Sequence, residues 1–226
     1  MKSYSLAVLL SGGCLLSANV LATSVDFRHE YKSDTKQHAS RVKMAHTFEN
    51  NFSMALELKF KGEEGKFMED LQSNGSEIDL GYRYKINDEW ALIPGMPIEF
   101  GQSGATYKPQ LRLTYTPEKV KGLSLSGRYR LDVKPGEDIK KYRHRYTANI
   151  GYKYQQWTFG LEGNYYYSDN SEYHLYNNGR TNYENNFTIH YSMGSWTPWL
   201  EFGDVSVSDQ SSQRELRSRI GLRYNF

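Results

Sequence analysis

Large apolar side chains alternate with polar and charged ones through most of this sequence, and this two-residue period constrains the fold more than any other feature. The clearest run is residues 52–61, where every second position is large and apolar: Phe52, Met54, Leu56, Leu58 and Phe60. An extended strand turns successive side chains to opposite faces, so each run has one apolar and one charged face. No stretch after residue 22 carries a sustained apolar stripe at helical spacing, and the sequence therefore predicts an all-β fold.

Twelve such runs follow one another, separated by segments rich in Gly, Asn, Asp and Pro. We expect strands at residues 24–32, 38–48, 52–61, 77–86, 90–100, 107–116, 123–134, 141–154, 157–167, 181–192, 196–205 and 215–226. Connectors 49–51, 87–89, 155–156 and 193–195 are short, whereas 62–76, 168–180 and 206–214 are long. An even number of strands with short turns at one end and long loops at the other is typical of a transmembrane 12-stranded antiparallel β-barrel of the bacterial outer membrane.

A secreted soluble β-sandwich or a lipocalin-like barrel would share the alternation, and three further features favour the membrane barrel. Aromatic residues of the apolar face lie toward strand ends, as in an interfacial girdle: Phe48, Phe52, Trp90, Phe100, Trp157, Tyr167 and Trp196. The opposite face holds too many charges for a packed core. The chain also ends on Phe226 after alternating apolar positions, like the terminal strand that the barrel-assembly machinery recognises during biogenesis. We therefore expect contact with outer-membrane lipid.

Residues 1–22 have the composition of a secretory signal peptide. Lys2 provides the positive start, an apolar core runs from Leu6 to Leu16, and a small-residue cleavage site ends at Ala22. A lipoprotein signal at Cys14 is a less favoured alternative, because Ser11 stands where such a site usually has Leu. The predicted outer-membrane β-barrel domain is then 23–226, which contains no cysteine and so no disulfide.

The charges of the chain nearly balance, but the alternation separates them in space. Lys and Arg number 28 against 26 Asp and Glu, a formal net charge of +2, so no basic excess favours nucleic acid as a partner. If the apolar face meets lipid, the other face lines a water-filled lumen with about twice as many cations as acids. We predict that thirteen of these cations form a substrate-binding pore lining: Arg28, Arg41, Lys43, Arg83, Lys108, Arg112, Arg128, Arg130, Arg143, Arg145, Arg217, Arg219 and Arg223.

Most arginines of this set, all except Arg83, fall into two groups along the sequence. One group belongs to the twelfth, first and second predicted strands and the other to the sixth, seventh and eighth, and these groups lie opposite one another in a closed ring. Guanidinium groups match carboxylates and can replace part of the hydration of an anion along its path. The sequence therefore predicts an anion-selective channel for ion and carbohydrate transport. The alternative is that the cations pair with lumen acids and rigidify the wall.

Several short stretches, spread over nearly the whole mature chain, resemble one known family: residues 25–30, 94–95, 128–130, 196–201 and 219–226. That family is the KdgM-type oligogalacturonate-specific porins. The resemblance implies a monomeric barrel that carries acidic oligosaccharides from pectin breakdown into the periplasm, and a related branch passes sialic acid. It carries over most firmly onto Arg28, Arg128, Arg130 and Arg223, whereas the loops 62–76 and 169–180 match poorly.

Two functions from other classes compete with a porin: an outer-membrane lipid hydrolase and a secreted sugar-binding barrel. Segment 73–75 is similar to the serine segment of such a hydrolase, but Leu71 stands where its histidine would be and no G-x-S-x-G occurs, so we interpret the segment as part of a loop. The six histidines form no zinc-type pair, and the acids of 63–70 lack the oxygen spacing of a calcium loop. We therefore predict passive, selective diffusion with no catalytic residue, cofactor or metal.

Overall fold

The computed structural model describes residues 22–135 and 141–226. The predicted signal peptide lies outside the described residues, except for Ala22, which begins the first strand. Nine strands cross the wall without interruption: β1 (Ala22–Lys32), β2 (His38–Thr47), β3 (Phe52–Lys61), β10 (Leu123–Lys134), β11 (Lys141–Tyr154), β12 (Trp157–Ser168), β13 (Thr181–Tyr191), β14 (Trp196–Ser206) and β15 (Arg214–Asn225). Three more crossings are each split in two: β4 (Gln72–Tyr82) with β5 (Tyr84–Lys85), β6 (Trp90–Gly95) with β7 (Ile98–Gly101), and β8 (Gly104–Tyr107) with β9 (Gln110–Tyr115).

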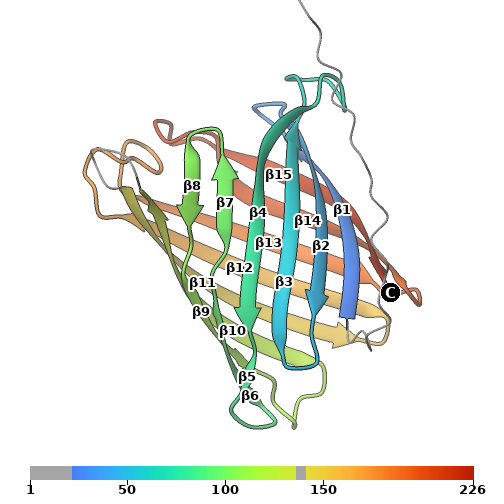
Figure 1. The fold of residues 1–226 in the computed structure, drawn as a ribbon. Coiled ribbons are helices and arrows are strands. Elements are labelled where there is room, and N and C mark those ends of the chain that lie inside the picture. The colour runs from blue at the N-terminus through green and yellow to red at the C-terminus, as the bar shows by residue number, and fades with distance from the viewer. Residues whose placement is uncertain (1–21, 136–140) are drawn as a thin grey trace, which may run out of the picture.

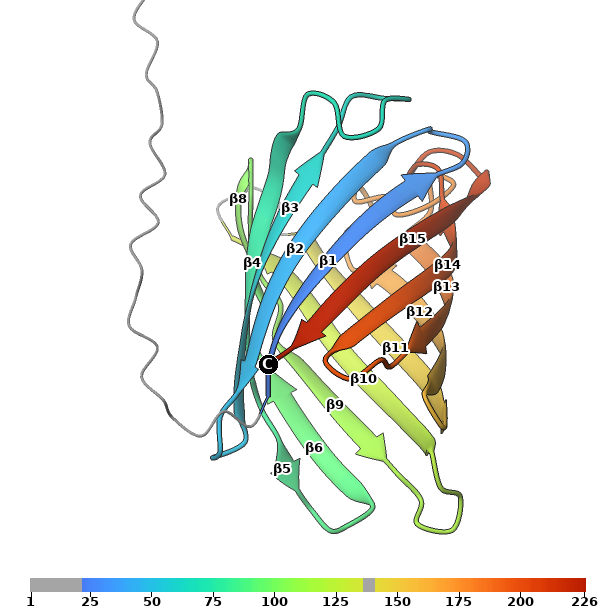
Figure 2. The same ribbon diagram turned by 90° about the vertical axis from the view of Figure 1, so that its right-hand side faces the viewer.

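These twelve crossings form one closed antiparallel β-barrel, which confirms the predicted fold (Figures 1 and 2). The two ends of the chain complete the ring, because β1 pairs with β15 as well as with β2, and Phe27 lies opposite Leu222. Closure leaves the barrel without a free sheet edge, so the strands satisfy one another's backbone hydrogen bonds, as a lipid environment requires. No helix in the described part of the chain has the length and apolarity to cross a bilayer.

Two of the three split crossings are interrupted at a proline. Pro97 separates β6 from β7 and Pro109 separates β8 from β9, and proline has no N–H to donate to a ladder. The carbonyls remain in use, since Lys108 N–H donates to Pro97 O at 2.8 Å and Leu131 N–H donates to Pro109 O at 3.0 Å.

The fourth crossing begins earlier than the sequence predicts. We expected a strand from residue 77 and a loop over 62–76, but β4 starts at Gln72 and Ser73 pairs with Phe60. The pairing shifts register between Leu58 and Phe60, where Gly75 on the partner strand has φ +94°. A bulge of this kind admits Ser, Asn and Gly into a strand, and these residues look like a loop in the sequence.

Connector lengths divide between the two ends of the barrel. The turns 48–51, 86–89, 155–156 and 192–195 lie at the lower end in Figure 1, whereas the longer loops 62–71, 169–180 and 207–213 lie at the upper end. Positive φ angles at Asn51, Gln155 and Gly194 allow the tight reversals at the short end. The C-terminus lies on this short-turn side (Figure 2). The predicted division is confirmed for these connectors, whereas residues 116–122 form a longer connector at the short-turn end and residues 102–103 a two-residue turn at the other end.

The barrel is apolar outside and charged inside. Leu56 and Leu222 are 42% and 41% exposed, whereas Asp26 and Glu215 are each 3% exposed. Outward tyrosines lie side by side in a row across four strands near the long-loop end: Tyr129, Tyr146, Tyr165 and Tyr183. At the short-turn end the outward aromatic pairs are Trp90 with Tyr115, Trp157 with Tyr191, and Trp196 with Tyr224. The outer surface is therefore a hydrocarbon-facing band between two aromatic girdles.

We expect an arginine to be costly on the outer wall and tolerated on the inner one. Ile220, on the outer face of β15, is 59% exposed, and Ile220→Arg is expected to lower the free energy of unfolding in bilayers by about 2–4 kcal/mol. Ser126→Arg adds the same side chain on the inner face and is expected to cost less than about 1 kcal/mol. Urea titration of vesicle-inserted protein measures both values, and equal losses would contradict the assignment of the two faces.

Candidate functional site

All thirteen cations of the predicted pore lining lie on the inward face of the wall. The alternation within each strand places them there, since their neighbours in sequence are the exposed apolar residues of the outer face. The site is therefore the lumen surface itself, and its chemistry depends on which of these cations have partners.

One part of the inner wall is organised around Asp26 on β1. Its carboxylate binds Arg41 of β2 at 2.6 Å and Arg223 of β15 at 3.3 Å. The indole N–H of Trp199, on β14, donates to the same carboxylate at 2.9 Å. The indole lies flat against the wall over Gly221, where a Cβ would come within 2.1 Å of the ring. Glycine at this position keeps the tryptophan out of the lumen.

Nearer the long-loop end of the same wall, Arg219 bridges two strands. It binds Glu30 of β1 and Glu201 of β14, each at 2.6 Å. Arg217 is adjacent and reaches Glu201 at 3.5 Å and Glu184 at 3.9 Å. Ion pairs thus connect four neighbouring strands, β13, β14, β15 and β1.

A second cluster lies on β3, β4, β7 and the residues that follow β8. Lys59 binds Glu99 at 2.9 Å and lies 3.6 Å from Glu77. Lys108 is only 4% exposed and binds Glu77 at 2.6 Å and Glu99 at 2.5 Å. Two lysines and two glutamates neutralise one another here, because a buried ammonium group is stable only with close partners.

A third cluster occupies β10, β11 and β12. Asp132 binds Arg130 at 2.7 Å and Arg143 at 2.6 Å. The ring of Tyr166 lies beside the guanidinium groups of Arg143 and Arg145, at 5.4 and 5.2 Å from its centroid. A buried aromatic ring between two cations holds them apart and fixes their orientation.

Ion pairing is more extensive than the excess of cations suggested. Within the described residues, ten of the thirteen predicted cations have a carboxylate partner within 4.0 Å: Arg28, Arg41, Lys43, Lys108, Arg130, Arg143, Arg145, Arg217, Arg219 and Arg223. For these, the alternative of a rigidified wall describes the resting state. The remaining three, Arg83, Arg112 and Arg128, have no such partner among the residues described.

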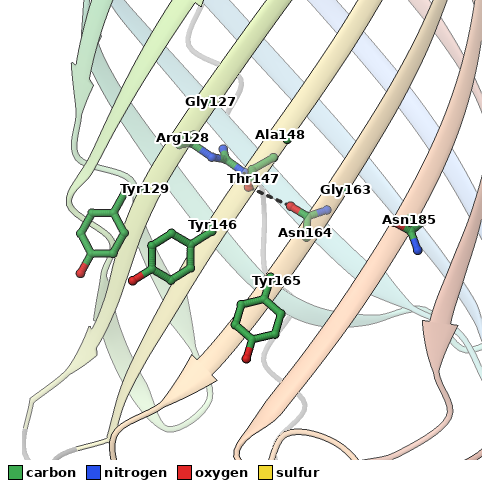
Figure 3. A pocket seen from close by; sticks show the side chains of 10 residues that line it. All are labelled: Gly127, Arg128, Tyr129, Tyr146, Thr147, Ala148, Gly163, Asn164, Tyr165 and Asn185. Atoms are coloured by element: carbon green, nitrogen blue, oxygen red, sulfur yellow. Dashed lines mark hydrogen bonds between the residues drawn. The ribbon is translucent and has the colours of Figure 1, made fainter.

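Arg128 is held by neutral groups instead of acids. Its guanidinium donates to Gln110 Oε1 at 3.4 Å and to Thr147 Oγ1 at 3.1 Å, and the Thr147 hydroxyl donates in turn to Asn164 Oδ1 at 2.8 Å. Figure 3 shows Arg128, Thr147 and Asn164 directed toward one another. The next residues along these strands project to the other side of the wall: Tyr129, Tyr146 and Tyr165. Neutral hydrogen-bond acceptors therefore position the Arg128 guanidinium without neutralising it.

Arg112 borders a cavity of about 560 Å³ against the inner wall. Hydroxyl and amide side chains dominate its polar lining: Thr114, Ser124, Ser126, Asn149, Thr158, Asn186 and Thr188. Arg83 and His190 also border it, with Glu162 and Glu201 as the acids. This part of the lumen, toward the short-turn end of β10 to β13, has a lower density of charge than the three ionic clusters.

Sequence reasoning missed three inward residues of this wall: Tyr166, Trp199 and Glu215. Each lies at an even spacing from an inward charge of its own strand, as Trp199 does from Glu201, so the same alternation would have located them. The expectation of an aromatic girdle assigns aromatic residues to the lipid-facing side, whereas Tyr166 and Trp199 are buried on the inner face. In the described part of the chain, no group of three or more His, Cys, Asp or Glu side chains is arranged to hold a metal ion.

Comparison with known proteins also indicates an outer-membrane porin. The family described as "Oligogalacturonate-specific porin protein (KdgM)" matches residues 16–226. The oligogalacturonate-specific porin KdgM of Dickeya dadantii is 32% identical over 249 residues, covering 100% of this chain and 99% of the relative. The N-acetylneuraminic acid outer membrane channel protein NanC of Escherichia coli K12 is 26% identical over 238 residues, covering 97% and 99%.

A solved structure supports the same relationship. The KdgM porin in complex with disordered oligogalacturonate matches with a TM-score of 0.67 at 27% identity, covering 90% of this chain and 99% of that one. Matches of this length span the whole barrel and not a single motif. With its closed ring of twelve crossings and its charged interior, the chain belongs to the KdgM family of outer-membrane porins.

Proposed function

We propose that this protein is a passive porin that carries anionic oligosaccharides, preferably oligogalacturonates, into the periplasm. The observation that carries the proposal is the pair of inward guanidinium groups without carboxylate partners, Arg112 and Arg128. Most of the other lumen cations already have an acid, so these two are the places where an incoming carboxylate does not compete with a carboxylate of the wall. A guanidinium presents parallel N–H groups that match the two oxygens of a carboxylate.

The ion-paired regions also favour anions, because several carboxylates are shared by two cations. Asp26 forms ion pairs with both Arg41 and Arg223, and Asp132 forms ion pairs with both Arg130 and Arg143. Each shared carboxylate leaves a net positive charge at that point of the wall. These places of excess positive charge give a chain of sugar acids attractive surfaces in addition to Arg112 and Arg128.

The arrangement of strands supports passage between two cationic surfaces. Arg41, Arg219 and Arg223 lie on β2 and β15, and Arg112 and Arg128 lie on β9 and β10. Strands β11 to β14 separate the groups on one side, and β3 to β8 separate them on the other. Near water-like dielectric, each charge contact contributes only about 1 kcal/mol, so cargo is attracted without being retained. The proposed translocation involves no covalent step.

A channel for sialic acid or another acidic sugar is the second candidate. Its support is the 26% identity to the N-acetylneuraminic acid channel NanC. Such a cargo carries one carboxylate per molecule, whereas an oligogalacturonate carries one per sugar unit and can contact both cationic surfaces at once. Current blockade by galacturonate oligomers of increasing length distinguishes them, because only a chain that uses several contacts binds more tightly as it grows.

We expect Arg112→Ser and Arg128→Ser to weaken anion selectivity and cargo binding. In planar bilayers, each change is expected to lower the affinity of a galacturonate trimer about fivefold, the equivalent of one lost contact of about 1 kcal/mol. The preference for chloride over potassium should fall in the same variants. Lys119→Ser, in the exposed turn 116–122, removes a cation outside the lumen and serves as the control. Unchanged blockade in both lumen variants would contradict the proposal.

Ionic strength provides a second test that requires no substitution. The Debye length falls from about 10 Å at 0.1 M salt to about 3 Å at 1 M. We therefore expect the blocking affinity of the trimer to drop at least about tenfold over this range, because most contacts in an open lumen are screened. A neutral oligosaccharide of equal length should show little change. A trimer affinity that is independent of salt would mean that charge does not drive binding.

A further inference from the structure

Asp79, on the inner face of β4, differs from every other inward carboxylate that the structure describes. It makes no hydrogen bond and no ion pair, whereas the rest each have at least one such partner: Asp26, Glu30, Glu57, Glu77, Glu99, Asp132, Glu162, Glu184, Glu201 and Glu215. An acid that sits unpaired beside a cationic lumen has its acceptor oxygens available.

The local sequence explains why Asp79 lacks a partner on its own side of the wall. Its cross-strand neighbour on β3 is Ala55, and the next inward position of β4 is Gly81, which lies opposite Gly95 of β6. None of these residues has a side chain that can donate a hydrogen bond. These three positions therefore offer the Asp79 carboxylate no side-chain donor.

Lys43 exerts the largest Coulombic attraction on the Asp79 carboxylate, and Arg128 and Arg112 follow, whereas Glu77 opposes them as a like charge. Lys43 is shared with Glu57 at 4.0 Å. The strand register places Asp79 near the two arginines that lack an acid. Gly81 of β4 lies opposite Gly95 of β6, Ile93 of β6 lies opposite Arg112, and Arg112 lies opposite Arg128. Only β6 therefore separates the strand of Asp79 from the strand of Arg112, although the acid forms no ion pair with either arginine.

We infer that Asp79, Arg112 and Arg128 form a binding station, made of one anionic and two cationic side chains, that recognises hydroxylated sugar acids. This inference rests on the proposed function and names the class of cargo that the station selects. Guanidinium groups can only donate hydrogen bonds and an ionised carboxylate can only accept them. A uronic acid supplies both complements, since its carboxylate binds the arginines and its ring hydroxyls donate to Asp79.

Simple anions fit this station poorly. Chloride, or a carboxylate without hydroxyl groups, is attracted by the arginines and repelled by Asp79, with no hydrogen bond in return. Discrimination therefore has two sources: Asp79 repels anions that lack hydroxyl groups, and it accepts hydrogen bonds from anions that carry them. The cavity that Arg112 borders adds Thr114, Ser126 and Asn149 as further partners for sugar hydroxyls.

The test compares two monoanions with six-membered rings in single-channel recordings: galacturonate, which carries hydroxyls, and cyclohexanecarboxylate, which does not. In Asp79→Asn, cyclohexanecarboxylate is expected to block about fivefold more tightly, because about 1 kcal/mol of repulsion is removed. Galacturonate should change by less than about twofold, since weaker hydroxyl bonding offsets the same gain. The ratio of the two affinities therefore falls about fivefold.

Two controls accompany this variant. Asp79→Glu keeps the charge and the acceptors and should retain the wild-type ratio within about twofold. Asp88→Asn removes an acid from the turn 86–89, where it pairs with Lys85 at 2.6 Å, and should leave the ratio unchanged. Each recorded channel is a folded one, so a loss of folding cannot imitate the result.

An unchanged ratio in Asp79→Asn overturns the inference. If galacturonate still blocks the wild type and Arg112→Ser still weakens that block, the proposed porin function stands and only the role of Asp79 fails. A wild-type channel that prefers cations and is blocked by neither compound overturns both.

Discussion

Closure of the backbone hydrogen-bond ladder is the constraint on which the rest of this structure depends. Hydrocarbon offers no partner for a peptide N–H or C=O, so the strands must satisfy one another around a complete ring. The pairing of β1 with β15 completes that ring. In the closed ring, the alternation along each strand places one set of side chains against lipid and the other set in the enclosed water. The charged interior follows from this geometry.

Charge compensation between neighbouring strands of the inner wall is the second level of organisation. Antiparallel neighbours bring side chains of separate strands to the same height, and acids and bases meet there in shared pairs such as Asp26 with Arg41 and Arg223. These pairs give the inner wall a defined shape. The same neutralisation leaves only a few groups available to a solute, and Arg112, Arg128 and Asp79 are distinctive because their strand neighbours offer no group of opposite charge.

The sequence predicted the number of crossings and the face of each lumen cation, because both follow from a period of two that a strand imposes on its side chains. The start of β4 could not be predicted, since Ser73, Asn74 and Gly75 have loop character and a bulge on one strand depends on its partner. The ion pairs were also out of reach. Arg41 meets Asp26 and Glu57 only because β1, β2 and β3 adopt one particular register, which alternation alone does not determine.

The two prolines that split neighbouring crossings also affect how easily the backbone hydrogen bonds of the wall open locally. Pro97 and Pro109 remove two donors from adjacent crossings in the same region, where Lys108 N–H still donates to Pro97 O. Fewer cross-strand bonds join the wall along this line than along the continuous ladder of β10, β11 and β12. Local opening requires the least energy where the fewest bonds must break, so amide hydrogens beside the prolines exchange with solvent deuterium ahead of the rest of the ring. The barrel thus contains a seam, and its stiffness differs from one side of its circumference to the other.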